Sequence, residues 1–206
     1  MADMDLDGRP DLVFIKRRST GTGTIEVHVL SAASGFGTFI QDTGTALSGA
    51  EDGNGDFTMA DVDRDGRPDL VFFKGQNTGT DTVELHAVSA ASGFQEFILH
   101  TGTALTTTEA AFGNFTMADV DLDGGLDLGF IKRRKTASGA IEVHVLSSAS
   151  GFQQFTQDIA SGFSQVDDGN GDFTMKDVNL DGMPDLVFIK RRSTGTGTIE
   201  LHGLAG

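Results

Sequence analysis

The sequence predicts an all-β fold, a β-propeller built from tandem four-stranded blades, and three observations support this prediction. First, one aspartate-rich segment returns every 58 residues, and repeats of this length are typical of propellers and other tandem architectures. Second, each copy contains short apolar or alternating runs separated by Gly-, Ser- and Thr-rich turns, the pattern of strands. Third, one run in each copy is apolar on both faces, as in a sheet packed on both sides. The copies span residues 1–58, 59–116, 117–174 and 175–206, the last is truncated, and we expect them to form a single domain of residues 1–206.

The second copy shows the four expected strands most clearly. Phe57–Val62 leads into the aspartate-rich loop, and Asp69–Lys74 leaves it as a continuous apolar run. Thr82–Val88 alternates with the period of a strand, and Phe94–Leu99 supplies the fourth strand before a loop rich in Gly and Thr. A solenoid would need shorter repeats and a sandwich would not repeat its sequence, so the pattern favours propeller blades.

The number of blades in the ring stays open at this point. The four copies either close alone as a four-bladed ring, or two chains form a larger ring. Because open sheet edges invite pairing, we expect a homodimer or an intimate edge contact in preference to a lone closed ring.

Composition excludes several classes of function. The chain has no cysteine, which removes disulfides, zinc–thiolate sites and thiol catalysis. No apolar run approaches the ~20 residues of a membrane span, so membrane insertion is not expected. The formal net charge is −15, which argues against a nucleic-acid partner. The four aspartate-rich loops hold fifteen carboxylates, so they account for all of the excess negative charge.

These loops have the spacing of a calcium site. Their pattern, Asp-x-Asp-x-Asp-Gly-x-x-Asp, places side-chain oxygens at positions 1, 3, 5 and 9 and a backbone carbonyl at position 7. Calcium takes six to eight oxygen ligands, whereas zinc prefers His or Cys and magnesium tolerates crowded carboxylates poorly. We therefore expect about four Ca²⁺ per chain, with the loop that contains Asn179 the weakest. The expected ligands are Asp3, Asp5, Asp7, Arg9 and Asp11; Asp61, Asp63, Asp65, Arg67 and Asp69; Asp119, Asp121, Asp123, Gly125 and Asp127; and Asp177, Asn179, Asp181, Met183 and Asp185.

A family resemblance follows from the same residues. The segment Phe-Thr-Met-Ala-Asp-Val-Asp-Leu-Asp-Gly at 115–124, and Asp-Leu-Val-Phe-Ile-Lys at 185–190, resemble the FG-GAP or VCBS-type repeats of integrin-α propellers, secreted bacterial and fungal proteins, and calcium-containing fungal propeller lectins. The resemblance implies a propeller, calcium at the loop positions named above, and an extracellular location.

Three other repeated features are open to two interpretations each. The Glu-x-His pairs are either polar ligands for a sugar or anion, or hydrogen bonds between blades, which we favour because they repeat in every copy. The basic runs either bind anionic glycans or, as we favour, solvate strand ends and balance the acidic loops. The Asp-Gly-Asn-Gly-Asp segments either hold further ions or a sugar hydroxyl, or form tight turns. These features are Glu26 and His28, Glu84 and His86, Glu142 and His144, Glu200 and His202; residues 16–18, 132–135 and 190–192; and residues 52–56 and 168–172.

The expected function is calcium-dependent binding of carbohydrate without catalysis, as in a lectin. Four equal copies of one polar pair lack the asymmetric constellation that an enzyme needs. The alternatives are a calcium-stabilised protein-adhesion or structural module, or an accessory domain of a secreted hydrolase. The absence of Trp and Tyr weighs against sugar stacking, and we expect Phe57, Phe72, Phe94 and Phe97 to be core residues.

Overall fold

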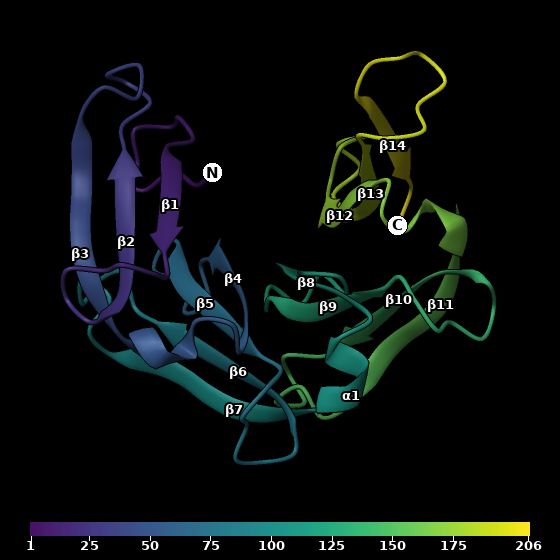
Figure 1. Cartoon of the computed structure of the whole chain (residues 1–206), viewed down its shortest axis with the longest axis horizontal. Helices are drawn as coiled ribbons and strands as arrows, with labels where there is room; N and C mark the ends of the chain where they lie inside the picture. The colour runs from purple at the N-terminus through teal and green to yellow at the C-terminus, as the bar shows by residue number, and fades with distance from the viewer. The chain divides into compact units, whose positions relative to one another are not determined.

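The computed structural model describes residues 1–206 and consists of antiparallel β-sheets joined by tight turns (Figure 1). The sheets have the orders β1-β2-β3, β4-β5-β6-β7, β11-β10-β9-β8 and β12-β13-β14. The prediction of an all-β fold built from repeated sheets is therefore confirmed. The strands are β1 (Leu12–Lys16), β2 (Thr24–Leu30), β3 (Phe39–Ser48), β4 (Gly55–Ala60), β5 (Asp69–Lys74), β6 (Thr82–Val88), β7 (Phe97–Thr106), β8 (Gly113–Ala118), β9 (Asp127–Lys132), β10 (Ala140–Leu146), β11 (Phe155–Ser164), β12 (Gly171–Lys176), β13 (Asp185–Lys190) and β14 (Glu200–Leu204).

The chain divides into two compact units, Met1–Gly102 and Thr103–Gly206, with the boundary inside β7. The first unit holds β1–β3 and the sheet that begins at β4, and the second holds β8–β11 and β12–β14. Three single-turn helices, η1 (Gly49–Glu51), α1 (Thr107–Ala110) and η2 (Gln165–Asp167), precede β4, β8 and β12. No helix is long and apolar enough to cross a membrane.

The predicted second and third strands of the repeat coincide with β5 and β6, but the predicted fourth strand is wrong. Phe94 lies in a turn with φ of +64°, and its ring is fully buried. The Ser92 hydroxyl accepts the N–H groups of Gln95 and Glu96, so the turn lasts until residue 96. Strand β7 then begins at Phe97 and includes the Gly- and Thr-rich run predicted to be a loop, because Thr fits an extended, half-buried strand well.

The buried turn before the last strand of each four-stranded sheet also bonds to the last strand of the preceding sheet. Ala46 in β3 donates its N–H to the carbonyl of Phe94 at 2.9 Å. Ala104 in β7 likewise donates its N–H to the carbonyl of Phe152, between β10 and β11, at 3.0 Å, and Phe152 has a φ of +63°. A non-glycine residue with positive φ is uncommon, so burial of the ring compensates for the backbone cost.

Each unit has its own apolar core. In the first, Ile25, Val27 and Val29 of β2 pack against Leu70 and Phe72 of β5. In the second, the cluster includes Ile141, Val143 and Val145 of β10 with Leu186 and Phe188 of β13. Phenylalanine rings on the first two strands of each four-stranded sheet, and of the sheet β12-β13-β14, stack at centroid distances of 4.4–5.1 Å. The stacked pairs are Phe57 and Phe72, Phe115 and Phe130, and Phe173 and Phe188.

Two of the three basic runs link successive sheets within a unit, through ion pairs with aspartates outside the aspartate-rich loops. Arg17 and Arg18, which follow β1, form ion pairs with Asp52, which precedes β4. Arg133 and Arg134, which follow β9, pair with Asp168 at 3.5 and 3.0 Å. The second copy has Gly75 and Gln76 where the first has its two arginines, and it has Ala110 where the first has Asp52. Cations and carboxylate are thus present together or missing together.

Candidate metal sites and the polar cleft

Three of the four aspartate-rich loops bring carboxylates together. In each of the three, the residues at positions 1, 3 and 9 each offer an oxygen, and these oxygens lie within 4.8 Å of one another. Each group therefore has the size and chemistry to hold a metal ion. The groups are Asp3, Asp5 and Asp11; Asp61, Asp63 and Asp69; and Asp119, Asp121 and Asp127.

In the second and third loops, the aspartate at position 1 leaves one carboxylate oxygen for an ion. In the second copy, Asp61 Oδ2 accepts the N–H of Gly66 at 3.0 Å, which closes the loop on itself. Gly66 has a φ of +89°, a conformation that glycine adopts without steric cost. The other oxygen of Asp61, and its counterpart Oδ1 of Asp119, are buried without a hydrogen-bond donor. A buried carboxylate oxygen without a partner is costly, so a cation fits this position.

Positions 3 and 5 are exposed and shape the turn. Asp63 Oδ1 accepts the N–H of Asp65 at 3.1 Å, and Asp65 Oδ1 accepts the N–H of Arg67 at 2.8 Å. The position-5 residues, predicted as ligands, lie outside the three converging groups. These residues are Asp7, Asp65 and Asp123. The backbone N–H at position 7 donates to position 5 in all four loops, and the calcium ligation expected of the position-7 carbonyls stays a prediction.

Position 9 has a second role that the sequence did not indicate. Asp69 is fully buried, and its Oδ2 accepts the N–H of Val62 at the start of the loop while its Oδ1 accepts the N–H of Ala90 after β6. The distances are 3.0 and 2.9 Å. The same two bonds recur in the other copies, from Met4 and Ala32 to Asp11, from Val120 and Ser148 to Asp127, and from Val178 and Gly206 to Asp185. This aspartate therefore ties its loop to the turn that follows the third strand of the same sheet.

The electrostatics of the second and third loops favour a bound cation. Burial, reinforced by the charges of Asp63 and Asp65, raises the pKa of Asp69 above its ordinary value. Burial and the charge of Asp121 raise the pKa of Asp127 in the same way. A raised pKa means that the carboxylate anion is disfavoured where it stands, and a bound cation would offset that penalty.

The fourth loop replaces one carboxylate with an amide that bonds to its neighbours. Asn179 Nδ2 donates to Asp181 Oδ2 at 2.9 Å and to Asp185 Oδ1 at 3.4 Å. Hydrogen bonds from Val178, Gly206 and Asn179 lower the pKa of Asp185. The amide hydrogens occupy carboxylate oxygens that a cation would use, which agrees with the expectation that this loop is the weakest site.

The Glu-x-His pairs make their contacts within their own sheet, so the prediction of hydrogen bonds between blades is wrong. Glu84 Oε1 accepts the N–H groups of Gly79 and Thr80 at 2.7 and 3.2 Å, and Glu84 Oε2 lies 3.4 Å from His86 Nε2. In the first copy, Glu26 pairs with Lys16 at 3.1 Å. Burial alone would raise the pKa of Glu26, but donors from Lys16, Thr22 and His28 lower it to about 2. These glutamates are anions that fix the turn between the second and third strands.

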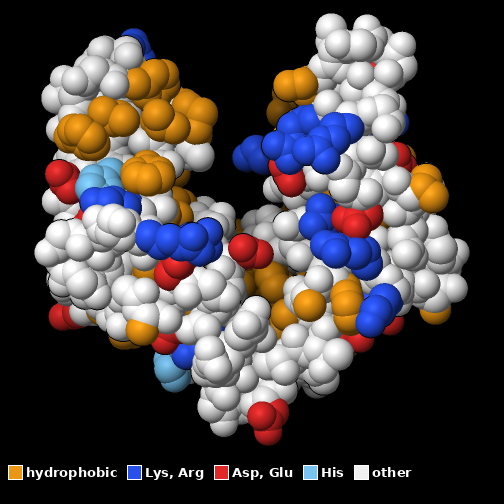
Figure 2. All heavy atoms as spheres, in the orientation of Figure 1, with side chains coloured by type: hydrophobic (Ala, Val, Ile, Leu, Met, Phe, Trp, Pro, Cys, Tyr) orange, Lys and Arg blue, Asp and Glu red, His pale blue; other side chains and the backbone are white.

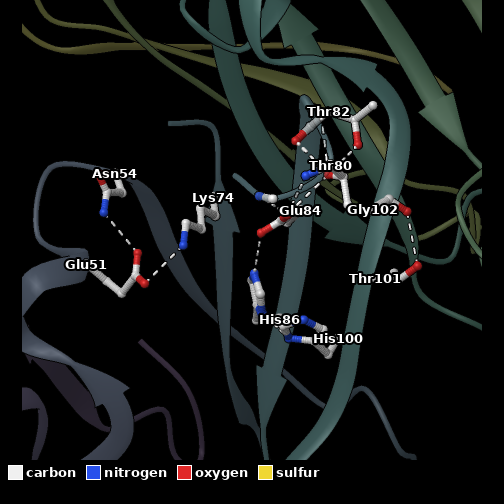
Figure 3. Close-up of polar contacts among 11 residues, drawn as sticks. Glu51, Asn54, Lys74, Thr80, Thr82, Glu84, His86, His100, Thr101 and Gly102 are labelled. Atoms are coloured by element: carbon white, nitrogen blue, oxygen red, sulfur yellow. Dashed lines mark hydrogen bonds and ion pairs between the residues drawn. The ribbon is translucent and has the colours of Figure 1, made fainter. Parts of the chain in front are cut away.

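A cleft lies in the first unit where β3 and η1 meet the face of β5, β6 and β7 (Figure 3). It has a volume of about 490 Å³. The strand register places Phe72 opposite His86 and Lys74 opposite Glu84, so aromatic and charged groups share this face. The residues that line the cleft are Ala46, Leu47, Ser48, Glu51, Phe72, Lys74, Glu84, His86, Phe97 and His100.

Phe97 at this cleft is exposed, which corrects its assignment to the core. Its ring is 46% exposed and lies edge-on to the rings of His86 and His100 at centroid distances of 6.3 Å. Phe39 and Phe155, at the same place in their copies, are 56% and 46% exposed and lie beside His28 and His144. Each of the first three copies therefore presents a ring next to a histidine, a feature that period-2 alternation along β7 could have indicated.

Comparison with known proteins identifies the class of repeat. The family model described as an FG-GAP-like repeat matches residues 3–72, which include the first two aspartate-rich loops. The chain therefore carries an FG-GAP-like repeat in this region. None of the curated proteins compared with the chain gives a match.

Proposed function

We propose that the chain is a calcium-stabilised, non-enzymatic binding module of the β-propeller type. The observation that carries this proposal is the convergence of three aspartates in each of three loops, with buried oxygens on Asp61 and Asp119 that have no hydrogen-bond donor. Oxygen-only ligand sets suit calcium better than zinc or magnesium. Bound calcium would offset most of the negative charge of each cluster and hold the first strand of a sheet against the second.

Closure of the sheets into a ring is part of this proposal. Phe14 in β1 is 56% exposed, whereas its counterparts Phe72 and Phe188 are fully or almost fully buried against stacked rings. Figure 2 shows hydrophobic side chains gathered over β1–β3. In a closed propeller each sheet face is covered by the adjacent blade. We propose that a further sheet, supplied by a second copy of this chain, covers this face.

Sedimentation of the calcium-loaded chain tests closure. We expect a mass of two chains, and Phe14→Asp should shift the population toward single chains, because a charge on an apolar interface is costly to bury. Val166→Asp, a change at a side chain that is 80% exposed on η2, is the matched control and should leave the mass unchanged. A single-chain mass at every concentration would contradict a homodimeric ring.

We propose carbohydrate as the ligand, bound at the cleft beside Phe97. An exposed ring supplies a surface for the apolar face of a sugar, and Glu84, Lys74 and Ser48 supply donors and acceptors for hydroxyl groups. The rings of Phe39 and Phe155 repeat this arrangement, so several weak sites would act together through avidity. The alternative is a protein-adhesion or structural module in which calcium only stabilises the fold.

A glycan array with calcium-saturated protein tests the carbohydrate proposal. For any glycan that binds, Phe97→Ala should weaken affinity at that site about tenfold, because aromatic anchors commonly contribute 1 kcal/mol or more to binding. Val166→Ala, which removes an exposed apolar side chain outside the cleft, should have no effect. If no glycan binds while calcium occupancy is confirmed, the carbohydrate proposal is wrong and the adhesion or structural alternative stands.

A further inference from the structure

The second copy differs from its neighbours at one position of the outer strand. His100 in β7 stands where the first and third copies have Asp42 and Asp158. In those copies the carboxylate faces Nδ1 of the neighbouring histidine, at 3.0 Å from His28 and 3.1 Å from His144. In the second copy, two imidazole nitrogens face each other instead: His86 Nδ1 lies 2.8 Å from His100 Nδ1.

The other side of the His86 ring fixes which of its nitrogens is free. Nε2 faces Glu84 Oε2 at 3.4 Å and has no hydrogen-bond partner of good geometry, although His86 is only 6% exposed. Burial alone would raise the pKa of Glu84, but donors from Gly79 and Thr80 lower it, so Glu84 is an anion. An anion beside Nε2 favours the proton there, which leaves the Nδ1 lone pair directed at His100 (Figure 3).

This arrangement has the form of a histidine metal ligand with its supporting carboxylate. Histidines that bind metals usually donate their other ring N–H to a carboxylate or carbonyl, which orients the ring. Burial and the nearby His100 lower the pKa of His86, which favours the neutral ring that a metal ligand needs. His100 is exposed and borders the cleft, so an ion and its water ligands have a path to both nitrogens.

We propose that His86 Nδ1 and His100 Nδ1 form a binding site for a divalent ion that prefers nitrogen ligands, with zinc as the representative ion. Two imidazoles suit Zn²⁺, Ni²⁺ or Cu²⁺, whereas calcium prefers oxygen. At zinc–nitrogen distances of 2.0–2.1 Å, the two nitrogens of a tetrahedral site lie roughly 3.3 Å apart, so a small rotation of the exposed His100 ring admits the ion. Water completes the coordination shell.

The surrounding charges favour a cation. Glu84 lies beside His86, and the one cation that lines the cleft, Lys74, is paired with Glu51 at 3.0 Å. Phe72 and Phe97 flank His86 and limit the directions from which water reaches it. The site is separate from the aspartate-rich loops, because none of its ligands belongs to them.

Zinc titration in excess calcium tests the site, because calcium then occupies the oxygen ligands of the loops. We expect one equivalent of Zn²⁺ per chain by calorimetry, and we expect the C2 and Nδ1 signals of both histidines to move in NMR spectra. His100→Asp restores the residue of the first and third copies, so it should fold normally. This variant should bind zinc at least tenfold more weakly, with an unchanged melting temperature in calcium.

The reciprocal variant tests whether the ligand set is sufficient. Asp158→His places a second imidazole beside His144, whose Nε2 lies 3.6 Å from Glu142 Oε2. We expect this chain to bind two equivalents of zinc. Zinc binding of equal strength in wild type and His100→Asp, no binding in wild type at millimolar zinc, or one equivalent in Asp158→His would each overturn the proposal.

Discussion

Removing calcium should lower the melting temperature of this protein by roughly 15–30 °C. An ion that binds only the folded chain stabilises it by RT ln(1 + [L]/Kd), about 2.7 kcal/mol for each site at a hundredfold excess over Kd. The three converging groups would together contribute about 8 kcal/mol, comparable with the ~5–15 kcal/mol stability of an ordinary domain. For a chain of this size, each 1 kcal/mol corresponds to about 2–4 °C.

Melting curves recorded in calcium and in chelator measure this loss of stability. The carboxylates at positions 1, 3 and 9 repel one another once the ion is gone, and salt screens that repulsion at exposed sites. We therefore expect molar sodium chloride to restore part of the lost stability in chelator and to change little in calcium. Superimposable curves in calcium and chelator would mean that the loops are ordinary turns.

Replacing the position-9 aspartate should be more damaging than replacing a position-3 aspartate, and should be damaging with or without calcium. Asp69→Ala removes the acceptor of two backbone N–H groups, those of Val62 and Ala90. A buried donor left without a partner costs about 1–3 kcal/mol, so we expect a loss of about 2–4 kcal/mol in chelator. In calcium the loss of a ligand adds to this cost.

Asp63→Ala is the matched control for this prediction. Asp63 is exposed and accepts only the N–H of Asp65, so its removal should leave stability in chelator nearly unchanged. In the presence of calcium, the substitution should lower the free energy of unfolding by the contribution of one calcium site, roughly 2.7 kcal/mol at a hundredfold excess of calcium over Kd. Denaturant unfolding of both variants under both conditions separates the two roles. Equal losses for Asp69→Ala and Asp63→Ala in chelator would show that position 9 acts only as a metal ligand.

Much of the repeat could be predicted because its strands follow local rules. The continuous apolar run at β5 and the alternation at β6 gave their bounds, since both patterns depend on which faces are buried. The start of β7 could not be predicted in the same way. The turn before it depends on the Ser92 hydroxyl and on burial of the Phe94 ring, which the local sequence does not specify.

The candidate sites were predictable to different degrees. Regular spacing along one loop brought the aspartates at positions 1, 3 and 9 together as expected. The second role of Asp69 depends on Ala90, a residue on the far side of a strand, and the partner of Arg18 lies 34 residues along the chain. Contacts between distant segments follow from tertiary packing, so spacing alone could not indicate them. The contact between His86 and His100 is also set by tertiary packing, so spacing alone could not indicate it.

Calorimetric titration of calcium into the chelator-treated chain tests the central claim most directly. We expect about three equivalents of calcium to bind with similar affinity, and the loop containing Asn179 to bind more weakly. The double variant Asp61→Asn and Asp63→Asn should remove one equivalent while leaving the remaining sites intact. No heat of binding at millimolar calcium, or a stoichiometry unchanged by the double variant, would contradict the assignment of these loops as the calcium sites that hold the fold together.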